Sequence, residues 1–332
     1  MDARRGGGGR PVKRVVLAGA SGFIGRELVA AYRAEGARVH VIGRSGPDAR
    51  WGQTAAITDL VDGADLLVNM AGKSVNCRYT PENRAEIIRS RVETTRELAE
   101  AVANAENPPP LWINSSTATI YRHAEDRPQT ESDGELGAGF SVEVAKAWEA
   151  AFFERPLPET RRVALRTAIV LGDGSVMGPF SMLTRLGLGG AQLDGRWFAS
   201  AARRAAGTFH EFRARRGRQR FSWVHMDDVI GAIRFLEQHA ELDGVVNVSS
   251  PSPTDSAGFM RTLRTVLGVP FGIPAPRFVL EIGSAAIKTE TELVLKSRWV
   301  VPERLLAAGY EFAYPELEPA LRQIIAAKRG LA

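Results

Sequence analysis

Short apolar runs rich in β-branched residues alternate along the chain with longer segments of helical spacing. The runs that predict strands cover residues 12–20, 37–44, 65–72, 110–117 and 161–172. The segments that predict helices cover residues 23–36, 80–106 and 139–152. The strands are apolar on both faces, which is typical of a parallel sheet covered by helices on both sides. We therefore expect an α/β fold with a doubly wound parallel sheet.

The alternation becomes mixed after about residue 172. Residues 218–228 and 244–250 still have the character of strands, and the C-terminal part is mostly helical in pattern. The first residues, 1–11, carry charge and glycine but no apolar stretch, so we expect a flexible tail there and no secretory signal.

Composition limits the class of protein. With 332 residues and 44% hydrophobic content, the chain can form one large domain, or a large domain with a smaller one. We find no run of about 18 apolar residues, so no membrane span is expected. Cys77 is the single cysteine, which excludes an intrachain disulfide and fits a reducing cytosol. We expect a cytoplasmic protein.

The net charge of +5 is unevenly placed. Residues 203–220 hold seven arginines against Glu211, and the rest of the chain beyond the basic tail is slightly acidic. This arginine-rich stretch fits three hypotheses: binding of anionic ligands or RNA, a solvated helix, or contact with a second copy in a homodimer. It lacks an established nucleic-acid motif, so we predict no nucleic-acid partner.

A glycine-rich turn follows the first predicted strand and opens the first predicted helix. Gly19, Gly22 and Gly25 form a G-x-x-G-x-x-G pattern, in the context that dinucleotide-binding turns have. Gly19 allows a tight turn, Gly22 lets backbone approach a pyrophosphate at the positive end of the helix, and Gly25 permits close packing. The other residues of this turn expected at the cofactor are Ser21, Phe23 and Ile24. The alternative is a glycine-rich turn without a ligand.

The end of the second predicted strand indicates which nicotinamide cofactor binds. An NAD-specific site usually has an acidic residue about 20 residues after the turn, where it holds the ribose 2′-hydroxyl. This chain has Arg44 and Ser45 there, which suit a 2′-phosphate. We therefore favour NADP(H); NAD(H) stays open, and the alternative for Arg44 is a solvated side chain.

Several motifs together resemble the extended short-chain dehydrogenase/reductase superfamily. They are "GASGFIG" (19–25), "NMAG" (69–72), "SSTATIY" (115–121), "LRTAIVLGDG" (165–174) and "SWVHMDDV" (222–229). The resemblance implies a set of residues beside the cofactor, namely Asn69, Met70, Ala71, Gly72 and Ser115. It also implies that Thr117 takes the position of the catalytic hydroxyl.

A narrower resemblance is to one atypical NAD(P)-dependent epimerase/dehydratase-like subfamily that ends in a small C-terminal domain of unknown function. It is carried by residues 90–98, 185–190, 217–228 and 300–321. It implies a Rossmann-type sheet and a smaller, mostly helical domain on the substrate side, but no particular substrate. We expect the dinucleotide-binding domain at 12–172 and a mixed region at 173–332. That region returns to the core at about 218–250 and ends in the small domain at about 270–325.

The proton-transfer pair of that superfamily, Tyr-x-x-x-Lys, is absent. None of the five tyrosines is followed by lysine four residues later, and Val142 precedes Lys146 at that spacing. If Glu149 matches the glutamate that follows the lysine in the superfamily, Ser141 and Ala145 occupy the two positions. The helical wheel then turns Lys146 to the solvent. The alternative is a displaced lysine that binds the nicotinamide ribose.

Other side chains can supply the proton. Tyr121 is the preferred candidate, with a structural role as its equal alternative; His123, His225 and Lys73 are weaker ones. Asn76, Arg78 and Tyr79 follow a strand end, where open α/β sheets bind ligands, and with His225 form the predicted substrate site. Loop packing and helix capping are the alternative for them. No cluster has metal-ligand spacing, so no metal is predicted.

Two functions fit these features. The first is an NADP(H)-dependent oxidoreductase or epimerase that acts on a small carbonyl or sugar-like substrate with a non-standard proton donor. The second is a non-catalytic NADP(H)-binding sensor or scaffold.

Overall fold

The computed structural model describes residues 12–174, 176–286, 290–328 and 330; the predicted tail at 1–11 lies outside them. A seven-stranded sheet forms the centre, in the order β3-β2-β1-β4-β5-β6-β10, and all of its pairings are parallel. The strands are β1 (Arg14–Ala18), β2 (Arg38–Gly43), β3 (Ala49–Arg50), β4 (Leu66–Asn69), β5 (Leu111–Thr117), β6 (Arg161–Thr167) and β10 (Gly244–Val248). The order reverses between β1 and β4, and the doubly wound α/β fold is confirmed.

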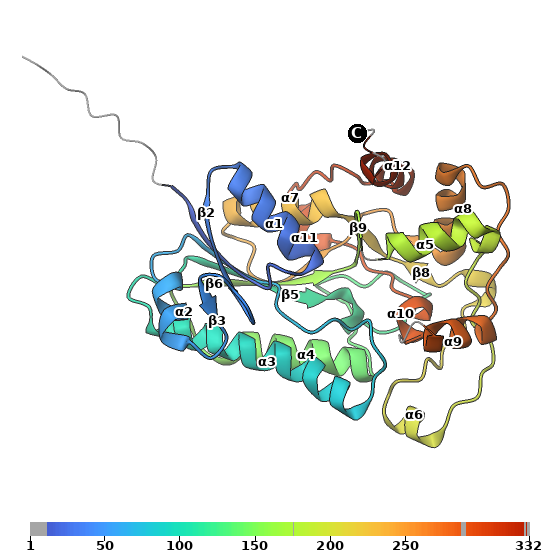
Figure 1. The fold of residues 1–332 in the computed structure, drawn as a ribbon, viewed down its shortest axis with the longest axis horizontal. Coiled ribbons are helices and arrows are strands. Elements are labelled where there is room, and N and C mark those ends of the chain that lie inside the picture. The colour runs from blue at the N-terminus through green and yellow to red at the C-terminus, as the bar shows by residue number, and fades with distance from the viewer. Residues whose placement is uncertain (1–11, 175, 287–289, 329, 331–332) are drawn as a thin grey trace, which may run out of the picture.

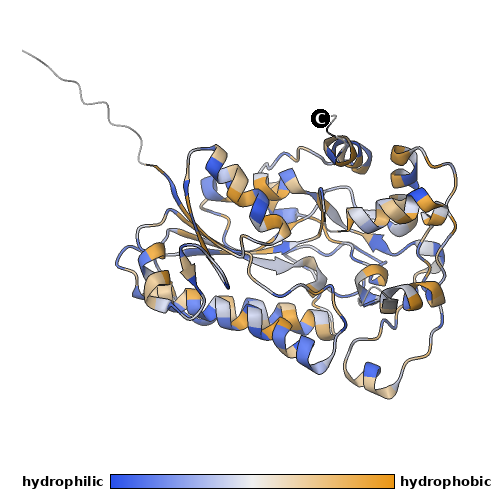
Figure 2. Cartoon of the chain, in the orientation of Figure 1, coloured by the Kyte–Doolittle hydropathy of each residue, from blue (hydrophilic) through white to orange (hydrophobic). Residues whose placement is uncertain are grey.

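Helices cover both faces of the sheet (Figure 1). One face carries α2 (Thr54–Val61), α3 (Pro81–Asn104) and α4 (Phe140–Glu154), and the other carries α1 (Phe23–Ala34), α7 (Met226–Gln238) and α11 (Glu303–Ala307). Each face has its own apolar core, with Leu98 and Phe152 among the buried side chains of the first, and Leu28 and Ile233 in the second. Figure 2 shows that these covering helices carry both polar and apolar residues, as amphipathic helices do.

The boundaries of α1 and α3 follow from local chemistry. Thr80 caps α3 by accepting a hydrogen bond from the backbone N–H of Asn83, and Pro81 occupies the first turn, as predicted. Gly36, with φ of +81°, follows the end of α1 and adopts the left-handed conformation that terminates many helices.

Two small sheets lie beyond the main one. Strand β7 (Ile169–Leu171) pairs with β9 (Trp223–His225), and β8 (Arg220–Phe221) pairs with β11 (Thr254–Asp255). The single strand predicted at 161–172 is therefore two strands. The chain changes partners at Ala168, whose N–H still bonds to Val248, whereas the next N–H bonds to Ser222.

The rest of the chain is mostly helical, as expected. The α-helices are α5 (Met177–Leu183), α6 (Ala201–Ala205), α8 (Ser256–Leu267), α9 (Arg277–Ala286), α10 (Glu292–Leu295) and α12 (Leu317–Lys328). Two short 3₁₀-helices are η1 (Ala118–Ile120) and η3 (Arg215–Gly217), and η2 (Thr184–Leu188) is a π-helix. A third apolar core joins α8 and α12 to β7 and β9. No helix in the described part of the chain is long and apolar enough to cross a membrane.

Candidate cofactor and substrate site

The glycine turn between β1 and α1 is packed so closely that side chains would not fit. Gly19 has a φ of +84°, and a Cβ there would lie 2.5 Å from the carbonyl carbon of Met70. A Cβ on Gly25 would lie 2.4 Å from the carbonyl oxygen of Gly19. Gly22 is the N-cap of α1 and provides no side-chain cap for the first turn. The turn thus presents bare backbone at a helix N-terminus, which fits the pyrophosphate of a dinucleotide.

The remaining residues of the turn differ in their contacts. Ser21 is exposed and Ile24 is half-buried against the core. The ring of Phe23 packs on Gly172 and Gly174, where added Cβ atoms would lie 2.9 and 3.3 Å from it. Phe23 therefore joins the turn to the segment after β7.

Arg44 and Ser45 are both exposed, just beyond the carboxyl end of β2. No hydrogen bond or ion pair to either side chain is found within the described residues. They follow the strand next to the glycine turn, since β1 pairs with β2 and the N–H of Gly19 bonds to Ile42. This is the place where a cofactor's ribose 2′ position would be recognised.

Asn69 is fully buried and holds the backbone beneath the glycine turn. Its amide donates to Asn114 Oδ1 (2.7 Å) and Thr95 Oγ1 (3.3 Å), and its Oδ1 accepts from the N–H of Ala71 (3.0 Å). Trp148 of α4 donates to the same Thr95 hydroxyl (3.1 Å). Asn69 thus positions the Met70–Ala71 backbone on which Gly19 rests.

Thr117, at the end of β5, is half-buried with a hydroxyl that can still donate. Its Oγ1 accepts a hydrogen bond from the N–H of Thr119 (3.1 Å), and its hydroxyl proton has no acceptor among the described residues, so it can bond to a ligand. Ser115, two residues earlier on the same side of the strand, is also half-buried. Both lie at the carboxyl edge of the sheet.

Tyr121 is buried, with 1% of its surface exposed. Its hydroxyl donates to Asn247 Oδ1 (2.9 Å) and accepts from Arg166 Nη1 (3.0 Å). Arg166 in turn makes a bidentate ion pair with Glu149. Because these bonds occupy the phenol inside the protein, the geometry favours the structural role that the sequence left as the alternative.

Helix α4 holds no proton-transfer pair. Lys146 is exposed and donates to the carbonyl of Gly137 (3.0 Å), as its predicted orientation requires. Ala145 is fully buried, and Ser141 donates to Glu292 Oε2 (3.1 Å). If Glu149 matches the glutamate of the superfamily, the positions of its tyrosine and lysine carry a small hydroxyl and a methyl group here.

Three of the four predicted substrate residues lie together in the loop between β4 and α3. Asn76 is exposed, Arg78 lies 3.5 Å from Glu290, and Tyr79 is 9% exposed with its ring against Phe140. The fourth lies apart from them. His225 caps α7 by accepting from the N–H of Asp227 (3.1 Å), and its Nε2 bonds to Gln323 of α12 (3.0 Å). These contacts match the structural alternative for His225.

Charged side chains near the C-terminus, which the sequence did not single out, complete this region. Lys296 donates to the carbonyl of Thr119 (2.7 Å), and Arg298 donates to the Thr119 hydroxyl (3.1 Å). Burial, followed by the charge of Arg298, lowers the pKa of Lys296 to about 8. The available signal was the density of charge in "TELVLKSR" (291–298), within an otherwise apolar stretch.

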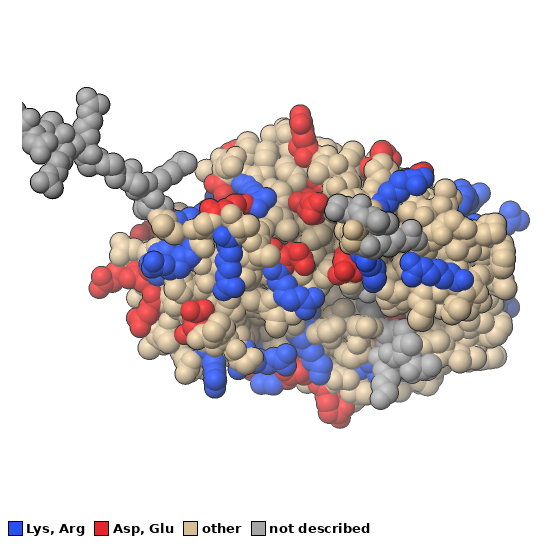
Figure 3. Space-filling model, turned by 45° about the horizontal axis from the view of Figure 1, so that its top comes forward, with Lys and Arg blue, Asp and Glu red and all other residues tan. Residues whose placement is uncertain are grey.

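Glu290 offers a buried acceptor to this region. One carboxylate oxygen accepts from the N–H of Tyr79 (3.0 Å), while Oε2 has no hydrogen-bond donor among the described residues. Arg203 lies 3.6 Å from Oε2 and also pairs with Glu281 (3.3 Å). One arginine of the predicted basic stretch therefore points inward. On the face shown in Figure 3, basic and acidic side chains are interspersed.

Comparisons with known proteins agree with this geometry. The NAD dependent epimerase/dehydratase family model matches residues 15–146, and the model of a domain of unknown function, DUF1731, matches residues 275–324. The chain is 32% identical to the epimerase family protein SDR39U1 of Bos taurus, over 94% of this chain and 100% of that one. The chain belongs to the NAD-dependent epimerase/dehydratase family.

Other members of the epimerase family extend the comparison. The Bacillus subtilis protein YfhF is 26% identical over 95% of this chain and 99% of its own. The crystal structure of human SDR39U1 (isoform 2) with NADPH superposes with a TM-score of 0.79, at 30% identity, covering 94% of this chain and 98% of that one. These matches confirm the family to which the sequence motifs pointed.

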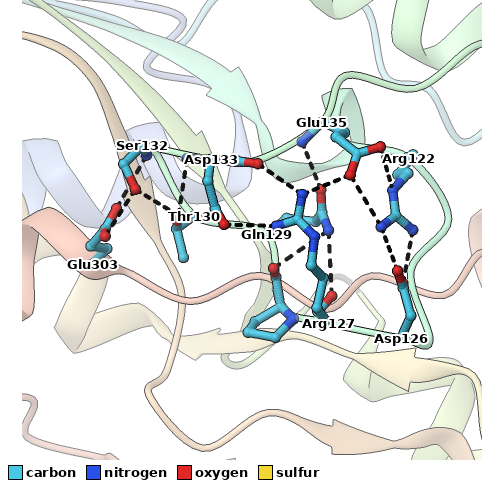
Figure 4. Close-up of polar contacts among 10 residues, drawn as sticks. Arg122, Asp126, Arg127, Gln129, Thr130, Ser132, Asp133, Glu135 and Glu303 are labelled. Carbon is cyan, nitrogen blue, oxygen red and sulfur yellow. Dashed lines mark hydrogen bonds and ion pairs between the residues drawn. The ribbon is translucent and has the colours of Figure 1, made fainter.

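In this member of the epimerase family, an ion-pair network fixes the loop after η1 (Figure 4). Arg122 pairs with Asp126 (2.8 Å) and Glu135 (3.1 Å), and Arg127 pairs with Asp133 (2.9 Å) and Glu135 (2.6 Å). The loop is joined to the C-terminal part, because the N–H of Gln129 bonds to Trp299 (2.7 Å) and Ser132 bonds to Glu303 (2.9 Å). The network thereby keeps residues 296–298 beside Thr119.

Proposed function

We propose that this protein is an NADP(H)-dependent oxidoreductase or epimerase that acts on a small carbonyl or sugar-like substrate without the Tyr-x-x-x-Lys pair. The observation that carries the proposal is the glycine turn, where Gly19 and Gly25 leave no room for side chains and Gly22 caps the N-terminus of α1. The NADPH in the human SDR39U1 crystal structure supports the same cofactor here.

The residues that would hold the cofactor come from the ends of neighbouring strands. The turn would bind the pyrophosphate, and Arg44 with Ser45 would bind the 2′-phosphate. Met70 and Ala71 would line the site, held in place by Asn69. When bound, the nicotinamide supplies a hydride to the substrate or accepts one from it.

Two groups of the chain suit a substrate with oxygen substituents. The hydroxyl proton of Thr117 can orient a substrate oxygen at the carboxyl edge of the sheet. Oε2 of Glu290 has the Arg203 guanidinium 3.6 Å away and no hydrogen-bond donor among the described residues, so it can accept a hydrogen bond from a substrate hydroxyl.

A binding and turnover experiment tests the proposal. NADPH fluorescence would be followed on the full chain, first alone and then with a panel of carbonyl compounds and sugar nucleotides. We expect NADPH binding and oxidation with at least one substrate class, and about a tenfold lower kcat/KM in Thr117→Val. Thr58→Val, on α2, is the matched control. Tight binding without turnover on the whole panel would favour the sensor or scaffold instead.

A further inference from the structure

Helix α9 buries its polar side chains. Arg277 and Glu281 are both buried and form an ion pair one turn apart (2.6 Å). Glu281 also pairs with Arg203 (3.3 Å), whose guanidinium lies 3.6 Å from Glu290. Ser284, on the same side of the helix, is buried as well. The inward side of α9 is therefore polar and adjoins the charged region of the candidate site.

The outward side of α9 is apolar. Phe278, Val279 and Ile282 are between 43% and 63% exposed. The other described positions of the helix that are exposed are Gly283 and Ala285, so no polar side chain interrupts this face among them. A helix whose outer side meets only water has its apolar residues on the inner side and its polar residues on the outer side. Because α9 has the reverse arrangement, its outward side has the character of a contact surface.

More exposed apolar side chains lie beside the start of α9. Phe271 and Ile273 are on the segment that leads into the helix. The N–H of Ile273 donates to the carbonyl of Gly187 (2.8 Å), and a Cβ added to that glycine would lie 2.8 Å from the Phe271 ring. Leu186 and Leu188 flank Gly187, and these four apolar side chains are between 45% and 67% exposed. Helix α5, which precedes the two leucines, lies at the same end of the molecule as α9 (Figure 1).

The exposed apolar area of this surface is close to that of a protein interface. A large apolar side chain has on the order of 200 Å² of surface when it is free in water, so these seven, each about half exposed, present roughly 700 Å² together. Each partner of a standard interface contributes about 800 Å². The exposed positions of α9 carry no charge, so a second copy meets them without repulsion. An anionic lipid surface would instead favour lysine and arginine beside the apolar side chains.

Gly283 indicates how two copies would meet. It lies within α9, where glycine is a poor helix former, and a Cβ on it would meet nothing within 4 Å. Packing among the described residues therefore does not explain a glycine at this position. A second helix that crosses α9 would explain it, because a residue without a side chain lets two helix axes approach closely.

We propose that the outward side of α9 is the contact surface of a homodimer, in which α9 packs against its own copy across a two-fold axis near Gly283. In such an interface each copy contributes the same residues. Phe278, Val279 and Ile282 would become buried between the copies, while the polar side of α9 would keep facing the candidate site. This inference goes beyond the proposed function and does not depend on it.

The mass of the full chain in solution tests the dimer. Light scattering after gel filtration, at about 1 to 100 µM, should approach twice the chain mass of 36.0 kDa. Ile282→Glu places a charge inside the contact and should raise the Kd of the dimer by about 100-fold or more. Leu306→Glu is the matched control, because Leu306 is an exposed aliphatic residue on α11, and its Kd should stay unchanged. Circular dichroism checks that both variants are folded.

Cross-linking detects the contact without a disruptive substitution. Cys77 is the single cysteine, so Cys77→Ala gives a chain without thiols. In that chain a short bismaleimide should join Ile282→Cys to its copy, and it should not join Leu306→Cys. A wild type that stays monomeric over the whole concentration range overturns the inference, and its flotation with phosphatidylglycerol vesicles would identify lipid as the occupant. A dimer that Ile282→Glu leaves intact, or that Ile282→Cys does not cross-link, overturns it too.

Discussion

At the scale of single residues, two glycines share the left-handed backbone conformation but differ in how much space a side chain would have. Gly19 and Gly36 have nearly equal φ values, +84° and +81°. A Cβ at Gly19 would collide with the backbone of Met70 and Ala71, whereas a Cβ at Gly36 would meet nothing within 4 Å. Conformation alone therefore explains the glycine at 36, while position 19 also requires the absence of a side chain.

This pair of glycines gives a prediction about stability. Gly36→Ala should cost only the left-handed conformation, about 1 kcal/mol of the free energy of unfolding. Gly19→Ala adds a clash with backbone that cannot move aside, so its cost should exceed that of Gly36→Ala by more than about 1 kcal/mol, and NADPH binding should be lost. Urea unfolding and a fluorescence titration measure both effects. Equal losses in the two variants would contradict the close packing of the turn.

Arg44 gives a prediction about cofactor choice. Arg44→Asp should weaken NADPH binding by about tenfold or more and NADH binding little, because the carboxylate would repel a 2′-phosphate and accept a bond from a 2′-hydroxyl. Isothermal titration with both cofactors measures the ratio of the two Kd values. Arg38→Asp, at the other end of the same strand, is the control for the change in charge. Equal weakening of both cofactors would remove the reason for the NADP(H) preference.

At the scale of elements, α4 is held in place by two ion pairs, one on each side of the helix. On its inner side Glu149 pairs with Arg166 of β6 (2.7 Å), and the two side chains are 12% and 10% exposed. The same carboxylate accepts from Ser116 of β5 (2.6 Å). On its outer side Glu154 pairs with Arg96 of α3 (2.8 Å), where both side chains are more than half exposed.

The two ion pairs of α4 should differ strongly in their effect on stability. Glu149→Gln leaves Arg166 without its charge partner inside the protein and should cost about 3 kcal/mol of the free energy of unfolding. Glu154→Gln should cost less than about 1 kcal/mol, because water and salt screen an exposed pair. Urea unfolding of both variants makes the comparison. A loss of similar size in both would contradict the buried network around Tyr121.

At the scale of the whole molecule, buried histidines make stability depend on pH. His210 is 4% exposed, and burial, followed by the charge of Arg277, lowers its pKa to about 3. Burial also lowers the pKa of His123 and of His225. A histidine in the unfolded chain has a pKa of about 6.5. Below that pH the unfolded chain therefore binds more protons than the folded chain, in which these histidines stay neutral.

Stability should therefore fall as the pH decreases from about 6.5 toward 3. Each such histidine contributes at most about 1.4 kcal/mol per pH unit in that window. His210→Gln removes one titrating group, so its free energy of unfolding should decline less steeply than that of the wild type between pH 6.5 and 4.5. Urea unfolding at several pH values, referred to pH 8, gives the two slopes. Parallel curves would show that His210 is protonated as readily in the folded chain as in the unfolded one.

The sequence alone determined the features of this protein that depend on residues close to one another along the chain. Periodicity predicted the parallel sheet, the spacing of Gly19, Gly22 and Gly25 predicted the turn, and counting tyrosines showed that Tyr-x-x-x-Lys is missing. These properties are local, because a strand, a turn or a helix face is encoded within a few residues. The Thr80 cap and the solvent-facing Lys146 followed from the same local logic.

Tertiary structure decided which distant side chains meet. Tyr79 and Glu290 come together, with the Tyr79 N–H bonded to the Glu290 carboxylate (3.0 Å), because the fold brings the β4–α3 loop and the C-terminal segment to one edge, which no local pattern encodes. Tyr121 looked available for chemistry in the sequence, and only the fold shows its hydroxyl bound between Arg166 and Asn247. A side chain's role depends on what surrounds it in space, and for this site the surroundings come from opposite ends of the chain.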